Sequence, residues 1–227
     1  MPSNTGFTIG KFKRELKNRF LCEVQIDGRD VVCYVPSSCH LSNFLQLEGK
    51  RVILIPTQTP NSRTKYALFA VPFKKNYIVL NTSMANRAVE CGLIGRRFSY
   101  LGKRKEWLKE HKIDGYKADL YIPSSKTIIE IKSIISTSDA AIFPTVYSER
   151  TIKQLNQIEE LLHKGYKVYF MIVSLHPYIK NITIDKNTEF YLELRKCLNA
   201  GLVVKAYTSR LKNNVLSVDK EININYQ

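Results

Sequence analysis

Three charged side chains in the stretch Gly115 to Lys132 have the types and spacing that metal-assisted chemistry requires. The stretch reads GYKADLYIPSSKTIIEIK, in which two segments of alternating apolar residues flank a Pro-Ser-Ser turn, and this pattern predicts a β-hairpin. Because strand side chains alternate between faces, Glu130 and Lys132 should point the same way. Pairing of the two strands would also bring Asp119 close to Glu130.

Two carboxylates and an ammonium group on a half-buried sheet face are unfavourable unless a further charge relieves their repulsion and desolvation. Mg²⁺ prefers oxygen ligands, often one or two carboxylates with water and substrate phosphate, so Asp119 and Glu130 are candidate metal ligands. Lys132 would then orient or activate an attacking water. The spacing resembles the PD-(D/E)XK nuclease signature, but taken alone it fits a solvent-facing hairpin edge with a cross-strand ion pair better.

The charge balance indicates what kind of partner the chain binds. The chain has 227 residues, enough for one large or two small domains, and carries a net charge of +15 with a pI near 9.6. Such a charge favours polyphosphate partners and does not by itself distinguish DNA from RNA. We expect a DNA partner, bound without strong sequence preference, with RNA as the alternative. A membrane surface would also attract it, but no apolar run is long enough to span a bilayer and no signal peptide is evident, so we expect no membrane association.

The cysteines and histidines indicate neither disulfides nor zinc. The five cysteines are scattered without CxxC spacing, and the four histidines form no zinc pattern with them. This usage is typical of a reduced, cytoplasmic protein with buried thiols.

Residues 1–75 predict a small, basic β-barrel of the OB type. Four or five short alternating strands are separated by turn signals such as Asp27-Gly28, and residues 72–77 are expected to be a linker. Several cations stand beside aromatic residues, as in nucleic-acid grooves with stacking platforms. The alternative for Phe12 and Phe20 is a place in the core. The candidate phosphate contacts here are Lys11, Lys13, Arg14, Arg19, Arg63 and Lys65.

Residues 76–227 predict an α/β domain with a mixed sheet flanked by helices. A first helix, capped by one of residues 81–83 and ended by Gly92, carries Glu90, which either pairs with Arg87 or adds a third carboxylate to Asp119 and Glu130. A basic stretch follows at residues 95–112. Its candidate phosphate contacts are Arg96, Arg97, Lys103, Arg104 and Lys105. Trp107, in the same stretch, reads as a core anchor more readily than as a base-stacking residue.

The rest of this domain alternates helices and apolar strands. Ser148 is expected to cap a helix that ends at Gly165, and the run YKVYFMIVSL suits a strand buried on both faces. A second helix ending at Gly201 and a final strand at residues 202–211 follow. Residues 133–147 look irregular, and the tail from Lys212 looks peripheral.

Several stretches together resemble the sugar fermentation stimulation protein (SfsA) family: VLNTSMANRAVE, IIEIKS, AAIFPTVYSER, KGYKVYFMIV and AGLVVKAY. The resemblance implies an OB-type barrel followed by a restriction-endonuclease-like, PD-(D/E)XK domain. It also implies DNA binding connected with the regulation of sugar-metabolism genes.

The resemblance implies roles for particular residues. Asp119, Glu130 and Lys132 match the nuclease signature and Glu90 matches a helix-borne acid, while a further set matches positions that support the site. This set is Lys117 (usually arginine), Glu149, Arg150 and Gln154 (where a histidine is expected). Two other departures are Thr145, in place of an aspartate, and the segment Pro36-Ser37-Ser38-Cys39, in place of Pro-Asn-Thr-Gly.

Three functions remain open at this point. The first is a Mg²⁺- or Mn²⁺-dependent nuclease in which Asp119 and Glu130 hold the metal, with Lys132 and Glu90 as catalytic groups. The second is a DNA-binding regulator of transcription without catalytic activity, and the third is an RNA-associated protein. The spacing does not decide whether the chain is an enzyme.

Overall fold

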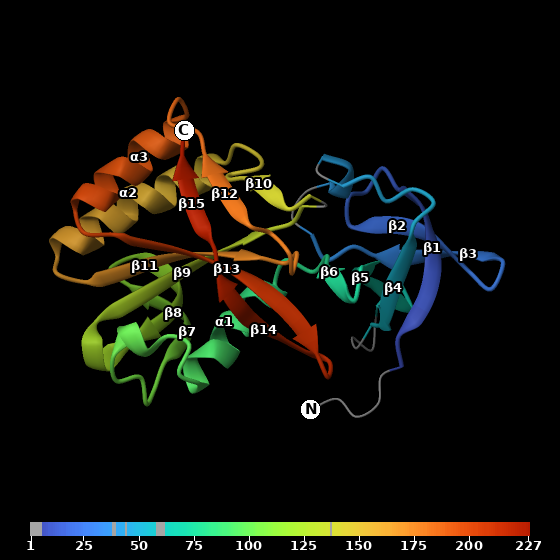
Figure 1. Cartoon of the computed structure of the whole chain (residues 1–227), viewed down its shortest axis with the longest axis horizontal. Coiled ribbons are helices and arrows are strands. Elements are labelled where there is room, and N and C mark those ends of the chain that lie inside the picture. The colour runs from blue at the N-terminus through green and yellow to red at the C-terminus, as the bar shows by residue number, and fades with distance from the viewer. Residues whose placement is uncertain (1–5, 38–39, 44, 58–61, 137) are drawn as a thin grey trace.

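The protein folds into two adjoining modules, an N-terminal barrel and a C-terminal mixed sheet with helices on both faces (Figure 1). The structure is a computed structural model that describes residues 6–37, 40–43, 45–57, 62–136 and 138–227. Ser38 and Cys39 of the segment noted above lie outside the described residues.

In the barrel, neighbouring strands are antiparallel and one parallel pairing closes the sheet on itself. Its strands are β1 Thr8–Glu15, β2 Leu21–Ile26, β3 Arg29–Tyr34, β4 Arg51–Pro56, β5 Tyr66–Phe73 and β6 Asn76–Val79. Their order is β3-β2-β1-β4-β5-β6, and a pairing of β3 with β5 closes the first five strands. Asp27 and Gly28, at φ values of 48° and 79°, form the tight β2–β3 turn that the sequence predicted. The predicted OB-type barrel is therefore confirmed.

The segment 72–77 was wrongly predicted to be a linker. It forms the end of β5, a turn at Lys74 and Lys75, and the start of β6, which pairs with β5 in register from Phe73↔Asn76 to Ala70↔Val79. Lys74 takes a left-handed conformation in this turn, with φ 53°. Two lysines in sequence suggested a connecting loop, but a hairpin needs only two turn residues.

The second module is built on a six-stranded sheet in the order β14-β13-β11-β9-β8-β7. Its strands are β7 Leu108–Ile113, β8 Tyr116–Ile122, β9 Thr127–Ile134, β11 Lys167–Ser174, β13 Val203–Lys212 and β14 Val215–Glu221. The central strands β9, β11 and β13 are parallel, and the outer pairings are antiparallel. A small parallel sheet, β10-β12-β15, stands beside it, with bounds Ala140–Ile142, Asn181–Ile184 and Asn223–Tyr226.

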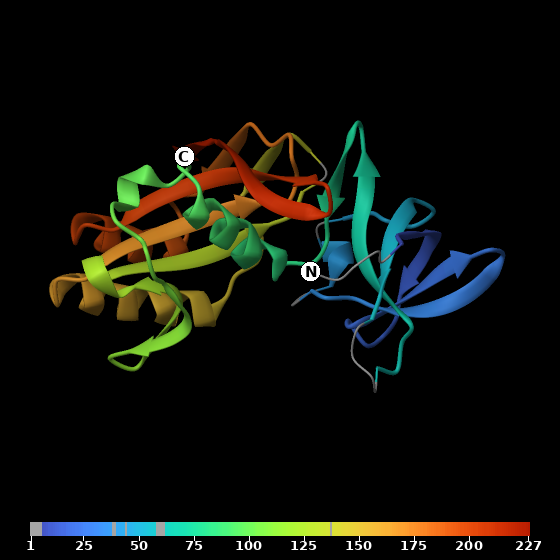
Figure 2. The same cartoon turned by 90° about the horizontal axis from the view of Figure 1, so that it is seen from below.

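Helices cover both faces of the large sheet, as Figure 2 shows from below. Helix α1 (Met84–Ile94) packs on one face, against β14 and β9, whereas α2 (Glu149–His163) and α3 (Glu189–Asn199) lie side by side on the other. Ser148 and Thr188 cap α2 and α3 by accepting backbone N–H groups, as the sequence suggested for Ser148. Within the described chain, no helix combines the length and apolar character needed to cross a bilayer.

Helix α1 continues through Gly92, where the sequence predicted its end. The residue is glycine because the ring of Phe98 packs against it: a Cβ at position 92 would lie 2.5 Å from the Cε2 atom of Phe98. The helix ends two residues later at Ile94.

Replacing Gly92 by alanine is expected to lower the free energy of unfolding by about 1–2 kcal/mol, measured by urea denaturation. The steric cost of overpacking, about 1–3 kcal/mol, outweighs the helix-propensity gain of about 1 kcal/mol. Cys91→Ala, at the exposed neighbouring position, is the control and should stay within about 0.5 kcal/mol of wild type. A stabilised Gly92→Ala variant would contradict the contact with Phe98.

The C-terminal tail was wrongly predicted to be peripheral. Residues 215–221 form β14, which pairs with β13 and buries Leu216 and Val218 against α1. Residues 223–226 form β15, which pairs with β12 in the small sheet. The segment 133–147, which was expected to be irregular, contributes residues 140–142 to the same sheet as β10. The tail looked polar because an edge strand with one exposed face alternates charged and apolar residues.

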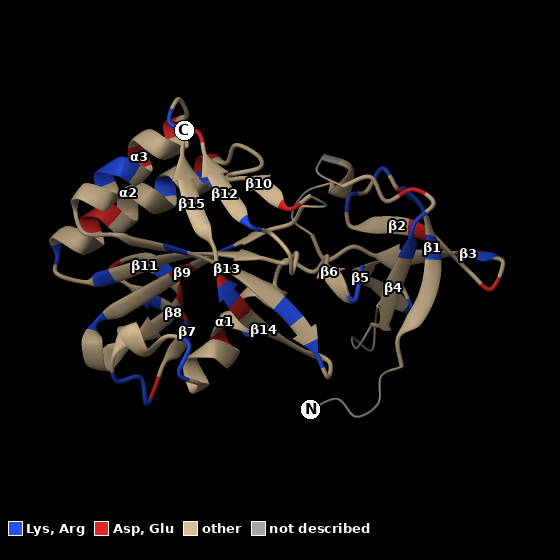
Figure 3. Ribbon diagram, viewed as in Figure 1, with Lys and Arg blue, Asp and Glu red and all other residues tan. Residues whose placement is uncertain are grey.

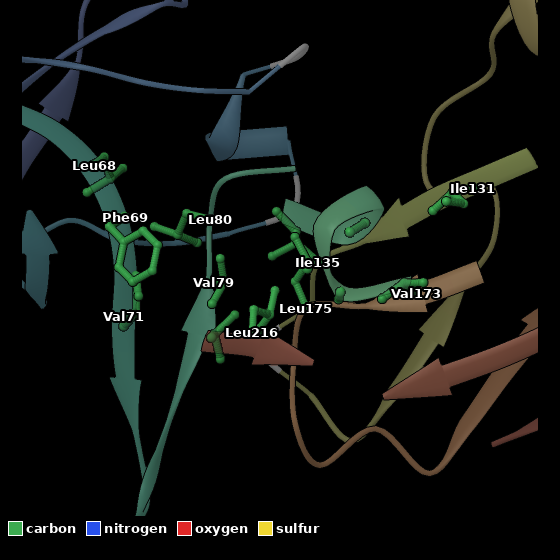
Figure 4. Close-up of a cluster of buried hydrophobic side chains, with 14 of the residues drawn as sticks. Leu68, Phe69, Val71, Val79, Leu80, Ile131, Ile135, Val173, Leu175 and Leu216 are labelled. Atoms are coloured by element: carbon green, nitrogen blue, oxygen red, sulfur yellow. The ribbon is translucent and has the colours of Figure 1, made fainter. Parts of the chain in front are cut away.

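The two modules share one apolar core at their junction. Val79 and Leu80 from the end of β6 meet Ile135, Leu175 and Leu216 from the large sheet and its connections (Figure 4). The backbone N–H of Val79 also donates to the carbonyl oxygen of Leu175 at 3.1 Å. The barrel is thus packed onto the sheet domain beside the amino end of α1.

Candidate active site

The hairpin of β8 and β9 places the three candidate residues as the alternation predicted. The strands pair antiparallel from Ile122↔Thr127 to Leu120↔Ile129. Just beyond this pairing, the Asp119 carboxylate accepts the backbone N–H of Ile131, which holds it close enough to Glu130 for the two charges to interact. Ile129 and Ile131 pack in the core on the α1 face, whereas Glu130 and Lys132 point toward α2.

Glu130 is almost fully buried, with 2% of its surface exposed. Its Oε2 atom accepts a short hydrogen bond from the Tyr116 hydroxyl, and its Oε1 atom accepts from Lys132 Nζ at 2.8 Å and from Gln154 Nε2 at 3.1 Å. Lys132 also donates to Gln154 Oε1 at 2.6 Å. The buried carboxylate is therefore balanced by one cation and two neutral donors.

The carboxylate of Asp119, on β8, lies between β9 and α1. Its Oδ2 atom accepts the backbone N–H of Ile131 at 2.7 Å, and its Oδ1 atom accepts from Asn86 Nδ2 at 3.2 Å. Burial, and next the negative charge of Glu130, raise the pKa of Asp119 from 3.8 to about 6. Burial and Glu130 likewise raise the pKa of the Tyr116 hydroxyl, which stays protonated as a donor. The pair of carboxylates thus holds more negative charge than its surroundings favour.

A pocket of about 1080 Å³ opens over this pair. Its walls come from β8, β9, the connection from β10 to α2, and the first turns of α2, including Glu149, Arg150, Lys153 and Gln154. The oxygens of two adjacent carboxylates suit a divalent cation that prefers oxygen ligands. The raised pKa of Asp119 shows that a positive charge at this place would be favourable. Gln154 replaces the expected histidine and reaches both Glu130 and Lys132, so the amide takes part in the site.

Glu90 lies apart from the carboxylate pair. Its carboxylate accepts from Lys109 Nζ at 2.5 Å, and it does not line the pocket. The sequence suggested a pair with Arg87 or a third carboxylate at the site, and it did not suggest Lys109. This lysine lies on β7, a strand that the basic composition of residues 95–112 concealed. Among the described residues, no group of three or more acidic, histidine or cysteine side chains could hold a metal.

Lys117 of β8 and Arg150 of α2 both line the pocket. Lys117 forms an ion pair with Glu110 across the β7–β8 hairpin, and both side chains are largely exposed. Arg150 is exposed on the first turn of α2. Thr145 sits at the pocket edge, where its hydroxyl donates to the carbonyl oxygen of Ile142 at 3.3 Å.

The predicted phosphate-binding cations are spread over both modules (Figure 3). In the barrel, Arg14 pairs with Glu23 at 3.0 Å, and the Arg19 guanidinium lies 4.8 Å from the centre of the Phe20 ring. Phe12 is buried in the core, as the alternative reading expected, whereas Phe20 is 39% exposed. Other exposed candidates are Lys11, Arg63, Lys65, Arg96, Arg97, Lys103 and Lys105, and Lys13 is half-buried.

Arg104 uses all three of its guanidinium nitrogens as donors to main-chain carbonyl oxygens. Its guanidinium donates to the carbonyl oxygens of Leu93, Gly95 and Gly102 at 2.9, 2.5 and 3.0 Å. These include carbonyls at the end of α1 that lack helical partners. Trp107 is partly buried against the core, in keeping with its expected role as an anchor.

The sequence did not indicate Tyr116 or Asn86 as parts of the site. Tyr116 stands on the same hairpin, three residues before Asp119, and Asn86 lies in the first turn of α1. Tyr116 could have been found as a hydroxyl on the strand that pairs with the strand of Glu130. Asn86 could be found only once α1 is known to pack against the sheet.

The comparisons with known proteins agree with this architecture. Residues 83–215 match the family model described as "Sugar fermentation stimulation protein RE domain", and residues 15–80 match "SfsA N-terminal OB domain". The chain is 26% identical to the sugar fermentation stimulation protein homolog of Pelagibacter ubique over 95% of each chain. It is 24% identical to the homolog of Methanobrevibacter smithii, over 88% of this chain and 90% of that protein.

One solved structure has the same fold along nearly its whole length. It is SfsA of Pyrococcus furiosus in complex with Ca²⁺, with a TM-score of 0.80 and 16% identity, covering 97% of this chain and 96% of that one. Since the family model alone spans more than half of the residues, the chain belongs to the sugar fermentation stimulation protein (SfsA) family.

Proposed function

We propose that the protein is a divalent-metal-dependent nuclease that hydrolyses DNA phosphodiesters in the pocket over Asp119 and Glu130. The observation that carries the proposal is the convergence of these two carboxylates with Lys132 and Gln154 at the base of one pocket. The net charge of +15 supports a polyanionic substrate.

Asp119 and Glu130 would hold Mg²⁺ or Mn²⁺ by their carboxylate oxygens. When bound, such a metal polarises a phosphoryl oxygen and lowers the pKa of a bound water. The solved structure of SfsA from Pyrococcus furiosus is in complex with Ca²⁺, a cation that also takes oxygen ligands, and this supports a cation in the same fold.

Lys132 and Gln154 would serve the attacking water and the phosphate. Lys132 Nζ donates to Gln154 as well as to Glu130, so Gln154 would keep it at the pocket if Glu130 held a cation. From there it would orient the water or stabilise charge developing on the phosphate. Arg150, at the open end of α2, would contact the phosphate backbone.

The test is the nicking of supercoiled plasmid DNA with Mg²⁺, with Mn²⁺ and with EDTA. We expect nicking that depends on the metal and that falls by at least about a hundredfold in Asp119→Ala, in line with the loss of a key catalytic group. Lys205→Met, a variant of an ion pair on the same sheet outside the pocket, serves as the control and should retain activity. Nicking that survives in Asp119→Ala would sink the proposal, because it would come from a contaminant.

The ion pair between Lys132 and Glu130 favours a second candidate, a DNA-binding regulator without catalytic activity. The lysine already neutralises Glu130, so only one of the two carboxylates, that of Asp119, is left without a cation when no metal is bound. This candidate predicts DNA binding without cleavage, with affinity that falls steeply with salt, by about −0.9 in the log–log slope for each phosphate contact. Competition among duplex DNA, single-stranded DNA and RNA for one labelled probe would show which nucleic acid binds.

A further inference from the structure

The connection between β10 and α2 presents exposed apolar side chains at the edge of the pocket. Val146 is 48% exposed and Tyr147 is 60% exposed, and both line the pocket above Asp119 and Glu130. An exposed tyrosine and an adjacent exposed valine at the mouth of a polar pocket suit contact with another molecule.

This connection is fixed at both ends, so it forms a defined platform. Phe143 is buried, with its ring edge-to-face against Phe190 at 5.4 Å and against Phe170 at 6.1 Å. At the other end Ser148 caps α2. The Tyr147 hydroxyl donates to Glu189 of α3 at 3.0 Å, which holds one edge of the ring and leaves most of its surface in solvent.

Cations stand immediately beyond the platform. Arg150 and Lys153 lie one helical turn apart on the part of α2 that lines the pocket, and neither forms an ion pair with another described residue. Two positive side chains next to an aromatic and an aliphatic side chain match a nucleotide, which offers phosphate on one side and a flat base on the other.

An exposed aromatic ring at the rim of the pocket would meet paired and unpaired strands differently. In an intact duplex the base faces are covered by their neighbours, so the rim of the pocket meets only sugar and phosphate. In a single strand or an unpaired segment the base faces are free to stack on Tyr147.

We infer that Val146 and Tyr147 form a base-stacking platform and that the pocket takes single-stranded or unpaired nucleic acid in preference to intact duplex. The inference rests on the proposed function for the location of the phosphate and adds the class of substrate. Arg150 and Lys153 bind the backbone of the strand whose base covers Tyr147.

The test is fluorescence anisotropy in EDTA, so that no cleavage takes place. The probes are a labelled single-stranded oligonucleotide of mixed sequence and the blunt duplex that it forms with its complement. Wild type should bind the single strand more tightly than the duplex. Tyr147→Ala should weaken single-strand binding by about tenfold and leave duplex binding unchanged, since one stacked base is lost.

Two variants serve as controls. Tyr147→Phe keeps the ring and should bind like wild type, which separates stacking from the hydrogen bond to Glu189. Val215→Ala removes a similarly exposed apolar side chain on β14, away from the pocket, and should change neither affinity. Tyr147 is exposed, so unfolding curves of its variants should match wild type.

Equal losses on both probes, or no loss on either, would overturn the inference. A shift in oligomeric state of Tyr147→Ala by size-exclusion chromatography would also overturn it, because the platform would then be a contact between copies of the chain. Because the assay is metal-free, its outcome is independent of plasmid nicking. A preference for single strands without nicking would leave the inference standing and remove the catalytic proposal.

Discussion

Lys132→Met is expected to lower the free energy of unfolding by about 3 kcal/mol, measured by urea denaturation at neutral pH. The methionine keeps the aliphatic stem but leaves Glu130, whose side chain is 3% exposed, without its cation. Breaking a buried pair from one side typically costs about 3–5 kcal/mol, and the remaining donors Tyr116 and Gln154 hold this value at the lower end.

The double variant Lys132→Met/Glu130→Gln should recover most of that loss, because it removes the uncompensated charge together with its partner. Lys196→Met is the matched control: its ion pair with Glu193 is also 2.8 Å long, but the lysine is 55% exposed. Its loss should be below about 1 kcal/mol. Equal effects of the two lysine substitutions would show that the Glu130 site is solvated.

Asp119→Asn is expected to raise the free energy of unfolding by about 3 kcal/mol at pH 8 in the absence of divalent metal. Burial and the charge of Glu130 raise the pKa of Asp119 from 3.8 to about 6, and one pKa unit corresponds to about 1.4 kcal/mol. Asparagine avoids this penalty, because its oxygen can accept from Ile131 N–H while the amide of Asn86 turns to accept from its nitrogen.

The gain should depend on pH with a defined sign. A carboxyl group whose pKa is higher in the folded state contributes stability that is fully present below its unfolded pKa of 3.8 and is lost as the pH rises through about 6. The difference between Asp119→Asn and wild type should therefore vanish near pH 4 and be complete near pH 8. Unfolding curves at several pH values measure it.

Asp139→Asn provides the control of opposite sign. A hydrogen bond and the positive charge of Lys180 lower the pKa of the exposed Asp139 carboxyl, so asparagine there should give no gain at pH 8. If Asp119→Asn gave a gain that did not change with pH, ionisation of this carboxyl would not be its source. A stabilised variant without nicking would fit a site whose native residues trade stability for function.

The features that the sequence predicted correctly depend on local patterns. Strand alternation placed Glu130 and Lys132 on one face, and the continuous apolar run marked β11 as a strand buried on both sides. The cap at Ser148 likewise needs only its own helix. For these elements, neighbours in sequence are the neighbours that decide the structure.

The features that it missed depend on contacts between distant segments. The sequence suggested that Gly92 ends a helix, but the ring of Phe98, six residues away, is what requires a glycine there. Arg104 was expected to contact phosphate, but its guanidinium donates to carbonyl oxygens at the end of α1. Asn86 reaches Asp119 from α1, and Lys109 reaches Glu90 from a strand that the basic composition concealed. Composition describes what a side chain can do, and packing decides which partner it finds.

The shared core at the junction makes the barrel and the sheet domain a single cooperative unit. Melting the barrel alone would expose Leu175 and Leu216 to water, and starting the chain at residue 76 would take β6 away from β5. Heat or denaturant should therefore unfold both modules together. A nucleic acid bound by both modules would contact two surfaces at a fixed distance from each other. The barrel would then fix how far along the strand, measured from the segment that it binds, the pocket acts.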